Sequence, residues 1–236
     1  MPEQTSAVAA NLARVRERIA RAAERAGRRA DEITLVAVSK TFPAEAIRAA
    51  YDAGLCEFGE NRVQEFEAKQ PKIADLNATW HLIGQLQSNK SRRAAQLFDR
   101  VDSVDSLALA QKLDSAAAEY GKRLPVLIEV HLGGEATKSG VAETELSALA
   151  EDLPALAHLE LRGLLAIPPY SDDPERARPY FRKLRQLRDG LSRRLGRPFP
   201  ALSMGMSHDF EVAIEEGATE IRLGTALFGS RTNVAG

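Results

Sequence analysis

The chain has 236 residues, of which 44% are hydrophobic and 28% are charged, a balance typical of globular proteins with a sizeable buried core. Its 32 basic and 33 acidic side chains leave a formal charge of -1, which excludes an overall field that would attract nucleic acid or an acidic membrane surface. One cysteine, Cys56, excludes an intramolecular disulfide, and no signal peptide or membrane-spanning apolar run is visible. We therefore expect a cytoplasmic protein without nucleic-acid or membrane partners.

The N-terminal region predicts a helix over residues 6–28. Val8, Leu12, Val15 and Ile19 recur at spacings of four, three and four, which places them on one helix face. Gly27 is a plausible end of this helix. The charged residues between the apolar ones are expected to form a solvated face.

Eight β-like runs follow and alternate with amphipathic segments. The strands are predicted at 33–38, 56–59, 80–83, 100–104, 125–132, 159–167, 201–204 and 219–223, and the clearest helices at 43–54, 106–120, 143–153 and 174–195. Eight strands each followed by a helix predict an α/β fold of the (β/α)₈ TIM-barrel class, with the barrel at about 33–231 in one domain spanning 1–236. The alternative is a doubly wound open sheet, because βα alternation alone does not close a barrel.

Catalytic and binding residues of such barrels lie at the carboxyl ends of the strands. Lys40 follows the apolar first strand, where desolvation and nearby cations would favour a neutral amine able to form a Schiff base. The alternative for Lys40 alone is an ordinary surface lysine whose ammonium reaches solvent.

Two glycine-containing strand ends predict a phosphate site. Gly205 and Ser207 follow the seventh strand, and Gly224 and Thr225 follow the eighth. Backbone N–H groups at helix starts, together with hydroxyls, bind anions, and barrel phosphate sites often occur after strands seven and eight. The alternative is that Ser207 and Thr225 only cap the helices that follow them.

Arg222 interrupts the apolar eighth strand and needs an acceptor wherever it is buried. A pyridine nitrogen could be that acceptor, and a permanently charged donor would keep the ring unprotonated and make it a poorer electron sink. A structural salt bridge to a neighbouring carboxylate is the alternative.

Six runs resemble, in order and spacing, the pyridoxal phosphate homeostasis protein family, also called the proline synthetase co-transcribed family. They are VAVSK at 36–40, FGEN at 58–61, HLIG at 81–84, LQSNK at 86–90, GMS at 205–207 and RLGTALFG at 222–229. The segment 135–140 also matches a family motif, and its role and that of 86–90 stay open. Gln85 and His208 depart from the commoner pattern, but neither removes a proposed ligand.

The family is similar in fold to the N-terminal barrel of alanine racemase, and the resemblance implies a set of cofactor contacts. Pyridoxal 5′-phosphate (PLP) would form an aldimine on Lys40, with no metal site implied. The remaining contacts would be Asn61 on the hydroxyl side, Ser207, Gly224 and Thr225 at the phosphate beside Gly205, Arg222 at the pyridine nitrogen, and His81 and Met204 lining the pocket.

Three functions follow as alternatives. The first is a monomeric, non-enzymatic PLP carrier that serves intracellular vitamin B6 homeostasis and delivers the cofactor to apoenzymes. The second is a weak PLP-dependent amino-acid racemase, which would need an acid/base on each face of the substrate; Lys40 could serve one face, but none of the four tyrosines belongs to a strand-end motif. The third is an interaction protein that docks a partner through basic helix faces around Arg92 and Arg93 or over residues 182–194.

Overall fold

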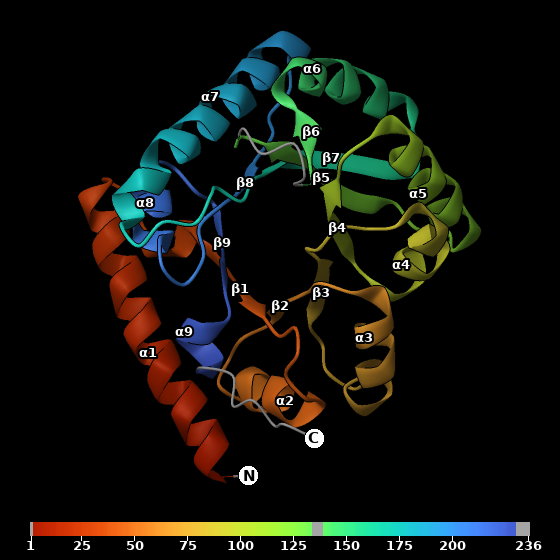
Figure 1. Cartoon of the computed structure of the whole chain (residues 1–236). Coiled ribbons are helices and arrows are strands. Elements are labelled where there is room, and N and C mark those ends of the chain that lie inside the picture. Colours follow the sequence, from red (N-terminus) through yellow and green to blue (C-terminus); the bar gives the residue numbers. More distant parts are fainter. Residues whose placement is uncertain (1, 134–138, 230–236) are drawn as a thin grey trace.

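The computed structural model describes residues 2–133 and 139–229, and eight parallel strands close into a barrel within them. Each strand pairs with the next, and the last pairs with the first, so the barrel prediction is confirmed and the open-sheet alternative is wrong (Figure 1). The barrel strands are β1 (Thr34–Val38), β2 (Glu57–Glu60), β3 (Thr79–Leu82), β4 (Arg100–Val104), β5 (Leu124–His131), β7 (Leu159–Leu165), β8 (Ala201–Ser203) and β9 (Glu220–Leu223).

One further strand lies outside the predicted set. β6 (Val141–Ala142) has two residues and pairs in parallel with β5 at Val130 and His131. A two-residue strand carries no alternation of apolar and polar positions, so the sequence pattern could not reveal it.

Helices form a ring around the barrel (Figure 1). The α-helices are α1 (Pro2–Arg25), α2 (Ala44–Asp52), α3 (Val63–Lys69), α4 (Ser91–Leu97), α5 (Leu107–Glu119), α6 (Glu143–Asp152), α7 (Arg178–Leu195), α8 (Phe210–Glu215) and α9 (Thr225–Phe228). Short 3₁₀ turns add η1 (Ala30–Glu32), η2 (Gln70–Lys72), η3 (Ser88–Lys90), η4 (Leu153–Ala155) and η5 (Pro174–Ala177). Within the described ranges, no helix is long and apolar enough to span a bilayer.

The extra N-terminal helix packs across the outside of α8, α9 and α2 (Figure 1). Its four predicted inward residues, Val8, Leu12, Val15 and Ile19, are all buried. The helix ends at Arg25 rather than near residue 28, and Gly27 adopts a left-handed φ of 65° in the turn that follows. Arg28 then donates hydrogen bonds to the backbone oxygens of Ile214 (3.2 Å) and Ala218 (2.7 Å), so it fastens this turn to the end of α8.

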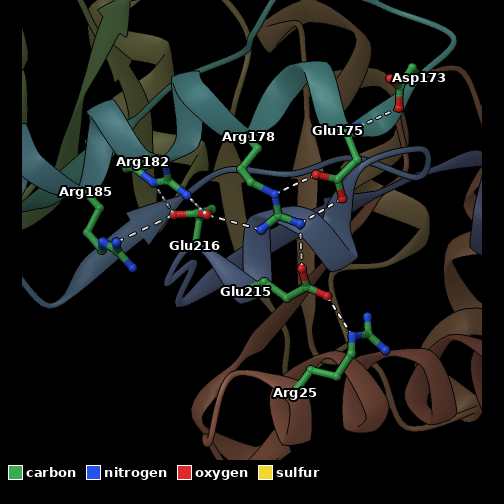
Figure 2. A network of polar contacts seen from close by, with 8 residues as sticks. All are labelled: Arg25, Asp173, Glu175, Arg178, Arg182, Arg185, Glu215 and Glu216. Carbon is green, nitrogen blue, oxygen red and sulfur yellow. Dashed lines mark hydrogen bonds and ion pairs between the residues drawn. The ribbon is translucent and has the colours of Figure 1, made fainter.

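A network of arginines and glutamates joins α1, α7 and α8 (Figure 2). The Glu216 carboxylate accepts hydrogen bonds from Arg178 (3.1 Å) and Arg182 (2.9 Å), and its side chain is only 6% exposed. Arg178 also pairs with Glu215 (2.7 Å), which pairs in turn with Arg25 of α1 (2.7 Å). Part of the charged surface of α1, expected to be solvated, therefore contacts the barrel's helical layer.

Candidate functional site

The strand ends place several predicted residues at one end of the barrel. In the β1–β9 ladder Val36 lies beside Arg222, and in the β1–β2 ladder Val38 lies beside Gly59. Lys40 follows β1 by two residues, Asn61 follows β2 directly, and residues 224 and 225 follow β9. Because all three strands are parallel neighbours, these groups lie at the same carboxyl-terminal mouth of the barrel.

The loops after β8 and β9 are held against each other. The Arg222 N–H donates to the Gly205 oxygen (3.0 Å), and the Ser207 hydroxyl accepts from the Ala226 N–H (3.2 Å). Gly205 has a φ of 93°, and a Cβ there would lie 2.6 Å from the Cβ of Ala213, so only glycine fits. The structure thus brings Gly205, Ser207, Gly224 and Thr225 together as the phosphate prediction requires.

The capping alternative for Ser207 is wrong, because Ser207 does not cap α8, the helix that follows it. Asp209 is the cap residue of α8, and its carboxylate accepts from the Met206 N–H at 2.7 Å. Ser207 instead contacts the first turn of α9 through Ala226, while Thr225 is the first residue of α9 and Gly224 its cap residue. Ser207 therefore crosslinks the two loops rather than capping the helix that follows it.

Arg222 points into the barrel and is 4% exposed. Its guanidinium donates to the Ser203 hydroxyl (2.7 Å) and to the Ala166 oxygen (3.1 Å). Burial lowers the pKa of Arg222, and the carboxylates of Asp102 and Glu129, among others, oppose that effect. An arginine keeps its charge even so, so the site holds a fixed, buried hydrogen-bond donor two residues before Gly224.

His81 belongs to a buried ionic network rather than to the group of strand-end residues. Its Nδ1 lies 3.2 Å from Asp102 and its Nε2 lies 2.7 Å from Glu57. Arg100 contacts both Asp102 and Glu220 at 2.5 Å. Because Glu57, Arg100 and Glu220 are the first residues of their strands, the network fills the amino-terminal end of the barrel, opposite the mouth.

Both ring nitrogens of His81 are therefore engaged, and Met204 is fully buried in the main apolar core. These contacts do not favour the prediction that His81 and Met204 line the cofactor pocket. This ionic network was not predicted from the sequence, because its residues come from four different strands and form no local motif.

The carboxyl groups of Glu129 and Asp209 both interact electrostatically with Arg222. Glu129, near the end of β5, is 5% exposed and accepts a hydrogen bond from Ser139 (2.8 Å). Asp209 is 7% exposed. Burial raises the pKa of both carboxyl groups, and the Arg222 charge opposes it. Glu129 was not singled out from the sequence, although a charged residue within the otherwise apolar fifth strand could have indicated a functional position.

A hollow of about 730 Å³ opens beside Asn61, lined also by Arg62, Glu65, Leu86 and Lys90. Gly84 makes this wall possible, because a Cβ there would overlap the backbone of Asn61. The segment 86–90 thus supplies part of the rim of the mouth. Most of the motif at 135–140 lies outside the described residues. No cluster of three or more His, Cys, Asp or Glu residues able to hold a metal occurs in the described part of the chain.

The basic helix faces considered as docking surfaces are paired with acidic residues. Arg92 contacts Glu119 at 2.7 Å, and Arg93 contacts Glu67 at 2.6 Å. On α7, Arg182 pairs with Glu216, and the exposed Arg194 contacts Glu151 at 2.5 Å. These intramolecular pairs reduce the positive charge available to a partner.

The barrel fold, with a lysine after its first strand, is that of the N-terminal domain of alanine racemase. Residues 10–232 match the family model described as alanine racemase, N-terminal domain. A likeness in fold alone would leave the activity open, because one fold supports many functions.

Relatives narrow the assignment. The chain is 50% identical to the pyridoxal phosphate homeostasis protein of Aquifex aeolicus over 93% of this chain and 96% of that one, and 48% identical to that of Pseudomonas aeruginosa over 96% of each. The structure of PipY from Synechococcus elongatus with PLP bound matches with a TM-score of 0.84 and 41% identity, covering 94% of this chain and all of PipY. The chain therefore belongs to the pyridoxal phosphate homeostasis protein family, as its motifs predicted.

Proposed function

We propose that this protein binds PLP at the mouth of the barrel, attaches it as a Schiff base to Lys40, and serves PLP homeostasis in the cytoplasm without ordinary catalysis. The observation that carries the proposal is the convergence of Lys40, the paired β8 and β9 loops and the buried Arg222 on one barrel end. The bound PLP of PipY and the names of the curated relatives support it.

The residues of the mouth fit an anionic pyridine aldehyde. Backbone N–H groups of the Gly205 and Gly224 loops, with the hydroxyls of Ser207 and Thr225, would hold the phosphate. Arg222 would donate a hydrogen bond to the pyridine nitrogen and keep that nitrogen unprotonated. When bound, PLP supplies an electrophilic aldehyde that condenses with amines. Asn61 would contact the ring's hydroxyl side.

The carrier role is favoured over racemisation by two features of the described residues. The fixed charge of Arg222 disfavours a protonated ring, which is the better electron sink. Tyr51 and Tyr180 lie in helices of the outer ring, Tyr120 directly follows α5, and Tyr170 is 78% exposed with its hydroxyl on Asp172. The first three belong to the helical layer or its edge, and the Tyr170 hydroxyl already donates to Asp172 at 3.1 Å, so we assign none of the four as the second acid/base of a racemase. As a carrier, the protein would act as a monomer and hand PLP to apoenzymes.

A spectral titration tests the proposal. Cofactor-depleted protein mixed with PLP should develop the visible band of a lysine Schiff base, and Lys40→Ala should abolish it. Lys90→Ala is the matched control, because Lys90 lines the neighbouring hollow and its loss should leave the band unchanged. The loaded protein should turn over amino acids more slowly than about 1 per second. A band that survives in Lys40→Ala, or faster turnover, would overturn the proposal.

A further inference from the structure

Lys40 sits in a turn with an unfavourable backbone conformation. The Phe42 N–H donates to the Ser39 oxygen at 3.1 Å, which closes a four-residue turn over Lys40 and Thr41. Thr41 has a φ of 67°, and among the described residues it is the only non-glycine with a positive φ. A β-branched residue in this region is strained, and such strain persists only where surrounding contacts impose it.

Two side chains of α3 hold the residues on either side of Lys40. The Glu65 carboxylate accepts a hydrogen bond from the Thr41 N–H, and the Lys69 ammonium donates to the Ser39 oxygen at 3.1 Å. Glu65 and Lys69 also pair with each other at 3.0 Å, one helical turn apart. Both backbone groups that flank Lys40 are therefore tied to one helix.

A buried carboxylate anchors this arrangement. Glu60, the last residue of β2, is fully buried and accepts hydrogen bonds from the Lys69 ammonium at 2.9 and 3.1 Å. It also accepts from the Ser39 hydroxyl at 2.7 Å. Burial raises the pKa of Glu60, and the Lys69 charge and the Ser39 hydrogen bond oppose that rise. Glu60, Glu65 and Lys69, together called the clamp, link β2 and α3 to the Lys40 turn.

We propose that the clamp residues are positioning residues, which hold the strained Thr41 conformation so that the Lys40 amine is presented to a carbonyl at the barrel mouth. The inference rests on the proposed function, because it assigns a purpose to the strain only if Lys40 is the attachment site. Backbone strain of this kind clusters at active sites and ligand clamps, and here it lies next to the lysine proposed to carry the cofactor.

The test compares the rate at which the Schiff-base band appears when PLP is mixed with cofactor-depleted protein. Lys69→Met and Glu65→Ala should slow band formation by about tenfold or more, because each removes a charge-assisted contact to the turn. Lys122→Met is the matched control. Its ammonium donates to the oxygens of Ala95 (3.0 Å) and Gln96 (3.1 Å) in α4 rather than to the Lys40 turn, so its loss should change stability but not the rate.

A double variant separates positioning from general stabilisation. With glycine at position 41 the positive φ costs little, so Glu65→Ala should slow the reaction less than about threefold in a Thr41→Gly background. Equal slowing in both backgrounds would contradict the proposal. The proposal would also be contradicted if Glu65→Ala and Lys69→Met both formed the band at the wild-type rate. If Lys69→Met fails to fold, a wild-type rate in Glu65→Ala alone contradicts it. If the wild-type protein forms no band, the proposed function itself fails; a wild-type band with unchanged variant rates rejects only the clamp.

Discussion

Buried His81, at the amino-terminal end of the barrel, should make the stability of the protein depend on pH. Burial by itself lowers the pKa of His81, but hydrogen bonds to Asp102 and Glu57 outweigh it and raise the pKa from 6.5 to about 9. His81 is 2% exposed, so solvent screens these contacts little. The imidazolium is thus the form that the folded barrel stabilises at neutral pH.

The magnitude follows from the difference between the folded and unfolded pKa. A rise from 6.5 to about 9 corresponds to about 3 kcal/mol of stability. Because the folded pKa is the higher one, this contribution is fully present below pH 6.5 and is lost as the pH rises through about 9. Replacing His81 by glutamine removes the titrating group while keeping an uncharged side chain that can still donate hydrogen bonds.

Urea unfolding of the wild type and of His81→Gln between about pH 6 and pH 10 measures this contribution. The wild type should be the more stable at low pH, and its advantage should shrink by about 3 kcal/mol across the range. Other titrating groups cancel in the difference between the two proteins. If the difference in unfolding free energy between the two proteins stays constant with pH, the reasoning is refuted, because His81 would then not be protonated in the folded protein.

Further predictions concern packing and the surface network. Gly84→Ala should displace Asn61, since the added Cβ overlaps its backbone, and a PLP titration should show weaker binding. Gly190→Ala is the matched glycine control; the new Cβ meets nothing within 4 Å in the middle of α7, so thermal unfolding should show a gain of about 0.5–1 kcal/mol. Glu216→Gln should cost about 1–2 kcal/mol, because the three α7 arginines lose their shared carboxylate, and the loss should diminish when unfolding is repeated in high salt.

Strand and helix positions were largely predictable, because apolar runs and helical periodicity are local properties of the sequence. The eight barrel strands follow the eight apolar runs, with ends shifted by a few residues; β7, for example, ends at Leu165 rather than at 167. Pro43, expected as the first residue of α2, is its cap residue instead. The loops that carry Gly205 and Gly224 were also identified correctly as neighbours, because consecutive barrel strands lie side by side.

Contacts between distant segments were not predictable. The roles of His81, Ser207 and Glu129 depend on partners from other strands, and the spacing of residues within one strand does not specify them. Glu65 and Lys69 stand four residues apart, which indicates a helical ion pair. Nothing in that spacing indicates that both also reach the turn around Lys40. Contacts between distant segments become visible only when the closed barrel is known.

Borohydride reduction followed by peptide mass spectrometry tests the central claim most directly, because it reports the cofactor and its attachment point together. Protein incubated with PLP and then reduced should carry a phosphopyridoxyl group on the peptide that contains Lys40 and on no other peptide. A label on a different lysine, or no label at all, would contradict the account.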